Sequence, residues 1–231
     1  MITLAKALLV SYLLPSGVLL HQMAVRRSDL LPERYDVSGT LTLVGDEARR
    51  AAAGLGLPAQ DTLSLPTTLS FSAGRCTVQI SGQALGGQRV VATNVGGQVT
   101  IDPPSSAQAV QSAGWLARLG CFPFLYRGEG AESGFESFLR KAGGDLDEAA
   151  LALEGEQVAY VIGAGEAGTG KVGLVIQKRG LLPLKVWETE GSTQVEVLFR
   201  GYRAVFHQGG FPTVVELRSG GQPVARFVAA Q

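Results

Sequence analysis

The segment VGLVIQ at residues 172–177 and the segment QVEVLFRGYRAVF at residues 194–206 decide the fold. Successive side chains of a strand point to opposite faces of a sheet, so Val195, Val197 and Phe199 would share one face. Glu196 of this segment and Arg218 of a later one would point to the other face. This alternation predicts strands with one apolar face and one hydrated face.

Similar segments fill the last third of the chain. They lie at residues 158–162, 172–177, 182–188, 194–206, 213–218 and 223–228. Gly191 and the pair Gly220-Gly221 fall between them, at positions typical of tight turns. A spacing of roughly ten residues leaves no room for crossover helices, so neighbouring strands must run antiparallel.

The first half repeats this pattern more loosely. Strand-like segments occur at residues 37–44, 67–72, 76–81, 89–95 and 98–101. A short helix is predicted for Asp46–Leu55, because acidic residues open it, alanines fill it and Gly56 follows it. The sequence therefore predicts a mainly β (α+β) protein built on an antiparallel curved sheet.

A helical insert is expected at about residues 103–153, inside a single domain spanning residues 28–231. Helices are predicted at 106–119 and 132–142, and a third at 146–153. Phe135 and Phe138 have helical spacing, and Phe122 and Phe124 flank Pro123. Such an aromatic stripe is typical of a core, and over an open sheet it also suits a lid.

The N-terminus carries an uncharged apolar run at residues 7–20, after Lys6. Its length of about 14 residues fits a secretory signal better than a membrane span of about 20 residues. We expect residues 1–24 to be a signal peptide or, if uncleaved at Ala24, an N-terminal anchor. A buried helix is the alternative, and Pro15 and Gly17 weigh against it. The export signal predicts a periplasmic protein.

Composition excludes several function classes. The chain has 20 basic and 20 acidic residues, so it lacks the positive excess that nucleic acid binding needs. No spacing of ligands suggests a metal, no cofactor is expected, and His207 is the one histidine outside residues 1–24. We therefore expect no catalytic set and no enzyme. Cys76 and Cys121 leave two alternatives open, one disulfide or two buried thiols.

A glycine-rich run at residues 163–171 has the spacing of a dinucleotide fingerprint and of the start of a phosphate-binding loop. Both motifs require a helix next, whose N-terminal amides hold the phosphate. The segment that follows is the strand-like VGLVIQ, and Val172 stands where the phosphate loop needs Ser or Thr. We interpret the run as a hairpin loop and expect no nucleotide.

The last third resembles the periplasmic lipoprotein-carrier family (LolA/LolB-like). The resemblance lies in residues 174–178, the Leu-Pro step at 181–185, Gly191, residues 195–199 with Tyr202, and Phe211-Pro212. The chain departs from the family at the corner after the first of these strands, where Gln177 replaces the usual acidic residue. It also lacks a recognisable C-terminal extension after Phe227.

The resemblance implies an unclosed antiparallel β-barrel whose concave apolar face is covered by helices and binds acyl chains. It also implies a basic residue on an early strand that holds the lid, for which Arg75 and Arg89 are candidates. The expected lining of cavity and lid is Val78, Ile80, Trp115, Phe122, Phe124, Phe135, Phe138, Leu174, Ile176, Leu184, Val186, Val195, Val197 and Phe199.

Two functions follow from this reading. The first is a periplasmic carrier for lipid or lipoprotein acyl chains, with partners at the inner and outer membranes. The second is a membrane-tethered structural or interaction module of the envelope, in which the helices plug the cavity permanently.

Overall fold

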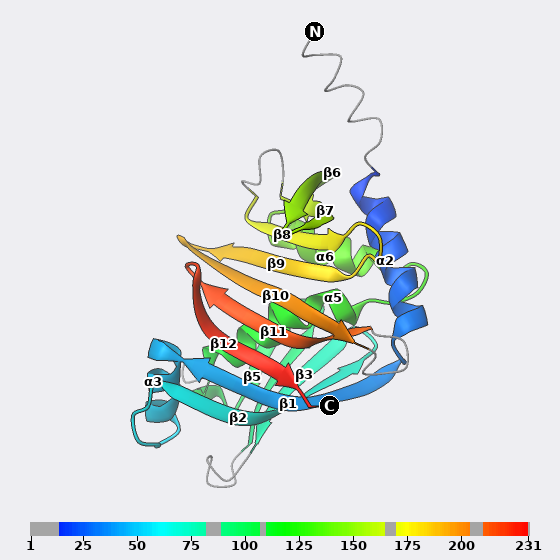
Figure 1. Cartoon of the computed structure of the whole chain (residues 1–231). Helices are drawn as coiled ribbons and strands as arrows, with labels where there is room; N and C mark the ends of the chain where they lie inside the picture. Colours follow the sequence, from blue (N-terminus) through cyan, green and yellow to red (C-terminus); the bar gives the residue numbers. More distant parts are fainter. Residues whose placement is uncertain (1–13, 82–88, 107–109, 165–169, 204–209, 231) are drawn as a thin grey trace.

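The structure is a computed structural model that describes residues 14–81, 89–106, 110–164, 170–203 and 210–230. Within these residues the strands form one antiparallel sheet, with helices α5 and α6 on its inner side and helix α2 standing across one end of the strands (Figure 1). This architecture confirms the predicted fold class.

The sheet has twelve strands. They are β1 (Arg34–Val44), β2 (Thr62–Ser72), β3 (Arg75–Ser81), β4 (Arg89–Val95), β5 (Gln98–Asp102), β6 (Asp145–Glu154), β7 (Gln157–Gly163), β8 (Val172–Gln177), β9 (Pro183–Glu190), β10 (Thr193–Arg203), β11 (Phe211–Ser219) and β12 (Gln222–Ala229). All the expected strands are therefore present, although residues 204–206 of the long one lie outside the described part of the chain.

The strand order is β5-β4-β3-β2-β1-β12-β11-β10-β9-β8-β7-β6. The two halves of the chain join where β1 pairs with β12, with Leu41 opposite Phe227. A side chain at Gly39 would overlap the Phe227 ring, since a Cβ there would lie 2.7 Å from it. In the described residues β5 and β6 have no partner beyond them, so the sheet curves without closing.

The helices fall into an N-terminal pair and a central insert. They are α2 (Ser16–Leu30), α3 (Gly45–Gly54), the 3-10 helix η2 (Pro104–Ser106), α4 (Gln111–Trp115), the π-helix η3 (Leu116–Gly120), α5 (Phe122–Leu125) and α6 (Glu132–Lys141). The predictions for residues 46–55 and 132–142 are confirmed. The helix expected at 106–119 begins at Gln111, and residues 107–109 are outside the described residues.

Helix α2 includes the last five residues of the apolar N-terminal run and continues past residue 24. Leu19, Leu20, Met23 and Ala24 are fully buried in the main core. Pro15 does not oppose this helix, because it occupies the N-cap, where the N–H that proline lacks has no partner within a helix. The expected cleavage position therefore lies in the middle of a core helix.

The helix expected at residues 146–153 is instead strand β6. Its Glu-Ala-Ala-Leu sequence favours a helix, but the tight turn at Gly155, with φ of +61°, folds it onto β7. Leu153 then pairs with Val158, and Leu151 with Tyr160. Sheet pairing outweighs helix propensity here because propensity differences are only a few tenths of a kcal/mol per residue. The helical insert accordingly spans 104–141.

Candidate functional site

The concave face of the sheet is apolar, as the alternation of its strands dictates. Val78 and Ile80 on β3, Leu174 and Ile176 on β8, and the β9 and β10 side chains all point into one core. The members from β9 and β10 are Val186, Val195, Val197 and Phe199. Each of these side chains is at most 3% exposed. The face predicted from sequence thus exists, and in this structure it is covered.

Aromatic side chains of the helical insert cover it. Phe122 stacks on Phe138 with ring centroids 4.0 Å apart and meets Phe135 edge-on at 5.4 Å. Phe124 meets Phe199 of β10 at 5.5 Å and Phe211 of β11 at 4.9 Å. Such ring pairs add about 0.5–1.5 kcal/mol each to the burial of their area. The four insert phenylalanines therefore fill the space between helices and sheet.

Leu184 is the expected lining residue that lies elsewhere. The pairing of β8 with β9 shifts between Val175 and Ile176, so that Leu184 is the extra residue of a β-bulge. A bulge reverses the alternation, so Leu184 and Val186 do not share a face. Leu184 packs instead on a second apolar cluster, with Val175 and Trp187 among its members, on the outer face.

Trp115 is half-buried at the mouth of the curved sheet. It lines a cavity of about 350 Å³ between the edge strand β5 and strands β9 and β10. Val99, Ile101, Leu119 and Val195 form the apolar part of its wall, and Arg118, Glu188 and Glu190 add charge. This volume is at the lower end of the range of small-molecule sites. Unless α4 and η3 move, only the first part of an acyl chain could enter this cavity.

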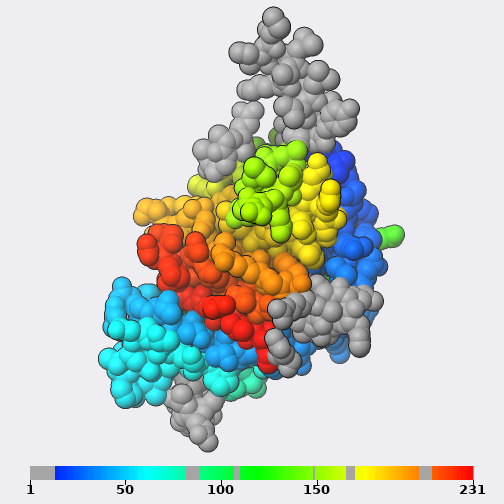
Figure 2. All heavy atoms as spheres, viewed as in Figure 1, coloured from blue at the N-terminus to red at the C-terminus, as the bar shows by residue number. Residues whose placement is uncertain are grey.

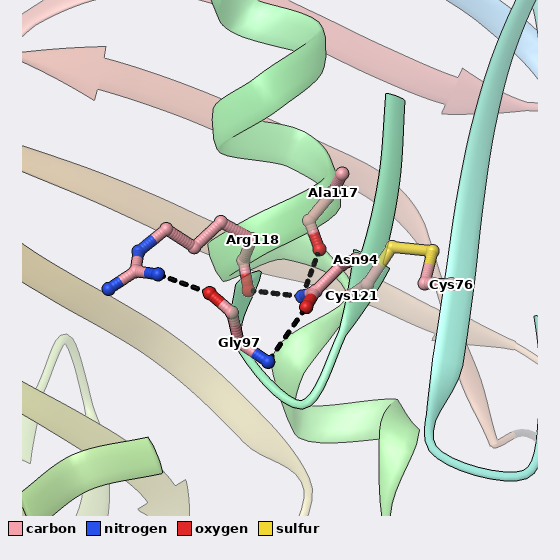
Figure 3. Close-up of a disulfide and its surroundings, with 6 residues drawn as sticks. All are labelled: Cys76, Asn94, Gly97, Ala117, Arg118 and Cys121. Atoms are coloured by element: carbon pink, nitrogen blue, oxygen red, sulfur yellow. Dashed lines mark hydrogen bonds between the residues drawn. A yellow bond between two sulfur atoms is a disulfide. The ribbon is translucent and has the colours of Figure 1, made fainter. Parts of the chain in front are cut away.

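A disulfide fastens the insert to the sheet. Cys76 of β3 and Cys121, which follows η3, are joined, and both are fully buried (Figure 3). Beside it the buried Asn94 amide donates to the carbonyl oxygen of Ala117 at 2.7 Å and accepts from the Gly97 N–H at 2.9 Å. The end of η3 is thus attached covalently to β3 and by hydrogen bonds to the β4–β5 hairpin.

Arg118 fastens the insert to the opposite side of the sheet. Its Nε and Nη2 atoms donate to the two carboxylate oxygens of Glu188 on β9, both at 2.6 Å. Its Nη1 atom donates to the carbonyl oxygen of Gly97, and its guanidinium lies 5.2 Å from the Phe138 ring centroid. Hydrogen bonding to Glu188 raises the pKa of Arg118, so its guanidinium stays charged. Arg118 therefore bridges β9 and the β4–β5 turn across the opening.

A second arginine, Arg27 on α2, is fully buried. Its Nη1 and Nη2 atoms donate to the carbonyl oxygens of Gly210 and Leu181, at 2.9 and 3.2 Å. Its guanidinium lies 5.8 Å from the centroid of the Phe124 ring. Burial lowers the pKa of Arg27 and raises that of the nearby Tyr202 hydroxyl. Arg27 thus attaches α2 to the loops before β9 and β11.

The two early-strand candidates for holding the lid lie outside the core that the insert covers. Arg75 and Arg89 are both exposed, at the first positions of β3 and β4. Arg118, which belongs to the insert, and Arg27, which contacts Phe124 of the insert, were missed because Glu188, Gly210 and Leu181, to which they donate, are 70 or more residues away in sequence. The faint signal available was the position of Arg118 within an otherwise apolar helix.

Replacing Cys76 and Cys121 together by alanine is expected to lower the free energy of unfolding by about 4 kcal/mol. The two cysteines are 45 residues apart, and without the bond the unfolded chain regains the entropy that closing this loop removes. Urea denaturation of the oxidised protein and of the variant measures this difference in the free energy of unfolding. Equal midpoints for the two would contradict a structural role for this disulfide.

Two other sequence motifs lie partly or wholly outside the described residues. The glycine-rich run joins the antiparallel strands β7 and β8, and its residues 165–169, like His207, are outside the described residues. Among the residues that the structure describes, no group of three metal-binding side chains occurs. None of the helices within them is both long and apolar enough to span a membrane.

Comparison with known proteins identifies the fold but finds no relative by sequence. No family model and no curated protein matches the sequence. A LolA superfamily protein from Nitrosomonas europaea superposes with a TM-score of 0.55 at 12% identity, over 94% of this chain and 92% of the other. An outer membrane lipoprotein-sorting protein domain from Vibrio parahaemolyticus gives a TM-score of 0.43 at 11% identity, over 89% and 87% of the chains. The first of these likenesses shows that the chain has the unclosed-barrel fold of a LolA superfamily protein.

Proposed function

We propose that this protein binds acyl chains of lipids or lipoproteins in the periplasm and acts as a carrier rather than an enzyme. The observation that carries the proposal is the apolar concave face, whose cover comes from helices, the insert and part of α2, instead of from the sheet itself. The cavity at Trp115 supplies the entrance. The likeness to a LolA superfamily protein supports the same reading at the level of the fold.

Binding on this face requires the insert to move, because the four phenylalanines occupy the space in the closed state. A chain of about 16 carbons gains roughly 12 kcal/mol on leaving water, at about 0.8 kcal/mol per methylene. That gain can offset the loss of the Arg118–Glu188 pair and of the ring contacts. Since Cys121 is attached to β3, we infer that α4 and η3 swing about this point.

The second candidate is the tethered, self-plugged module. A specific observation favours it: the insert is attached to both sides of the sheet, by the disulfide and by Arg118, and its phenylalanines leave the concave face filled. In that case the insert never opens, and the protein takes up no lipid.

Uptake of a fluorescent fatty acid distinguishes the carrier from the self-plugged module. The carrier is expected to bind it, and Glu188→Gln is expected to bind it more tightly because that variant loosens the Arg118 attachment. Glu154→Gln is the matched control, since Glu154 pairs with Lys185 at 3.4 Å outside the insert. Native mass spectrometry of protein purified from an envelope extract would show the natural ligand. No uptake by any of the three proteins, with no bound lipid, would exclude the carrier.

The location of the N-terminal signal also needs a revised proposal. Because α2 belongs to the core, we place the signal or anchor in the residues before Ser16. N-terminal sequencing of the protein from envelopes is expected to give a start at or before residue 16, or an intact Met1 for the tethered form. A start at Val25 would contradict this placement.

A further inference from the structure

Two charged side chains are buried in the described part of the chain, and only one of them has a counterion there. Glu47 on α3 pairs with Arg50 at 2.8 Å, and its other oxygen accepts from the N–H and the hydroxyl of Ser112, at 2.9 and 2.6 Å. Arg27 on α2 is 0% exposed and forms no ion pair with any described residue. A charge taken out of water without an opposite charge destabilises a folded protein. Arg27 is therefore the one buried charge that the described residues leave uncompensated.

The hydrogen bonds of Arg27 do not supply the missing negative charge. Two of its nitrogen atoms donate to backbone carbonyl oxygens, which are neutral, and among the described residues its Nε has no hydrogen-bond partner. Burial lowers its pKa, and the other ionisable groups that act on this pKa are the hydroxyls of Tyr202 and Tyr35 and the guanidinium of Arg26. None of these groups is a carboxylate. Asp29, the acidic residue nearest to Arg27 in sequence, is exposed.

Arg27 borders the apolar core through the ring of Phe124. The centre of its guanidinium lies 5.8 Å from the centroid of that ring, and the ring meets Phe199 and Phe211 of the sheet at 5.5 and 4.9 Å. Helix α2 itself packs against the segment between β8 and β9, where blue and yellow spheres meet in Figure 2. Phe124 belongs to the insert, which must move before an acyl chain can lie on the concave face. Withdrawal of Phe124 would therefore leave the guanidinium facing the space that the chain enters.

We propose that Arg27 binds the anionic head group, a carboxylate or a phosphate, of the amphiphile whose acyl chain lies on the concave face. The inference rests on the proposed carrier function and adds the charge of the ligand to it. In the loaded state the head group takes the place of the Phe124 ring and accepts hydrogen bonds from the guanidinium. The planar set of N–H groups of an arginine fits two oxygen atoms of a carboxylate or phosphate.

The ligand then supplies the counterion that the described residues lack. Its attraction to Arg27 is strong because the aromatic surroundings exclude water and screen charge poorly. A neutral amphiphile of the same length would fill the same apolar space but leave the buried charge uncompensated. The site should therefore select ligands by the charge of the head group as well as by the length of the chain.

Isothermal titration calorimetry of the full chain tests this selectivity. Dodecanoic acid, dodecyl phosphate and dodecanol have the same chain length, and at about pH 8 the first two are ionised. At least one of the anions is expected to bind about tenfold or more tightly than the alcohol, which is the effect of one hydrogen bond to a charged group. The comparison of the acid with the phosphate shows which anion the site prefers.

Replacing Arg27 identifies the residue responsible. Arg27→Met removes the charge and keeps much of the side-chain volume, so it should bind the preferred anion about tenfold or more weakly and the alcohol as the parent does. Arg27→Lys keeps the charge and should retain part of the preference. Arg226→Met, at an exposed position of β12, is the matched control for the loss of one positive charge and should bind all three ligands as the parent does.

Equal binding of the anions and the alcohol by the parent chain would overturn the inference and leave the carrier function standing. An Arg27→Met variant that loses all three ligands equally would also overturn it, because Arg27 would then act on the fold and not on the head group. If Arg27→Met does not fold, the preference of the parent chain decides. Binding of none of the three amphiphiles by the parent chain would contradict the carrier function itself, and the inference with it.

Discussion

A chain that begins at Val25 is expected not to fold, whereas a chain that begins at Leu14 unfolds like the full-length protein. The shorter chain lacks Leu19, Leu20 and Met23, all fully buried. Loss of a buried side chain of this size costs about 2–5 kcal/mol, so three of them approach the roughly 5–15 kcal/mol that hold a domain together. It also loses the hydrogen bond from the Gly128 N–H to the Ala24 carbonyl oxygen.

Circular dichroism during heating measures this difference. The chain from Leu14 is the control, because it retains every described residue of α2. A cooperative transition at the same temperature in both chains would mean that α2 is dispensable, and the boundary at residue 24 would then stand.

Phe124→Ala is expected to lower the free energy of unfolding by about 3–5 kcal/mol. Phe124 is 1% exposed and lies among the rings of Phe71, Phe199 and Phe211 and the Arg27 guanidinium. The residual cavity is walled by aromatic groups that cannot move into it without leaving the sheet. In a domain of this size the melting temperature should fall by roughly 6–20 °C.

Val228→Ala, on the exposed side of β12, is the matched control and should change the free energy of unfolding by less than about 0.5 kcal/mol. An unchanged denaturation midpoint for Phe124→Ala would contradict the packing of α5 on the concave face. If the carrier proposal is right, the new cavity should also bind a short fatty acid more tightly than the parent does, as engineered apolar cavities bind small apolar molecules.

The strands of the last third could be predicted because their alternation is local information. The spacing of Val195, Val197 and Phe199 indicates their common face without information from any other segment. The glycines at 191, 220 and 221 indicate the turns. The aromatic helix at 132–142 was predictable for the same reason, since Phe135 and Phe138 have a helical spacing.

The missed features depend on contacts that one sequence does not encode locally. A single extra residue in β9 turns Leu184 to the outer face, and periodicity gives no sign of it. The segment of β6 has helix propensity, and only its pairing with β7 makes it a strand. Leu19 and Leu20, at the end of the apolar N-terminal run, are buried in the core, and the composition of the run gives no sign of this contact.

The way the insert is attached explains why the sequence could not distinguish a ligand cavity from a permanently filled core. The same phenylalanines suit a removable lid and a permanent core, and the difference lies in what holds them. Asn94, Arg118 and the disulfide hold the insert at η3, and Trp115, the residue directly before η3, borders a cavity. Ser112 of α4 is also attached, since its N–H and hydroxyl donate to a carboxylate oxygen of Glu47 at 2.9 and 2.6 Å.

Photocrosslinking with a fatty acid that carries a diazirine at its methyl end tests the carrier proposal most directly. Peptide mapping after irradiation of the full chain is expected to place the label on the concave face, in residues 172–176 and 195–199 and on the insert at 111–125. Label confined to the exposed side chains Leu151, Leu153 and Val158 of β6 and β7, or no saturable label at all, would contradict acyl-chain binding and leave a self-plugged envelope module.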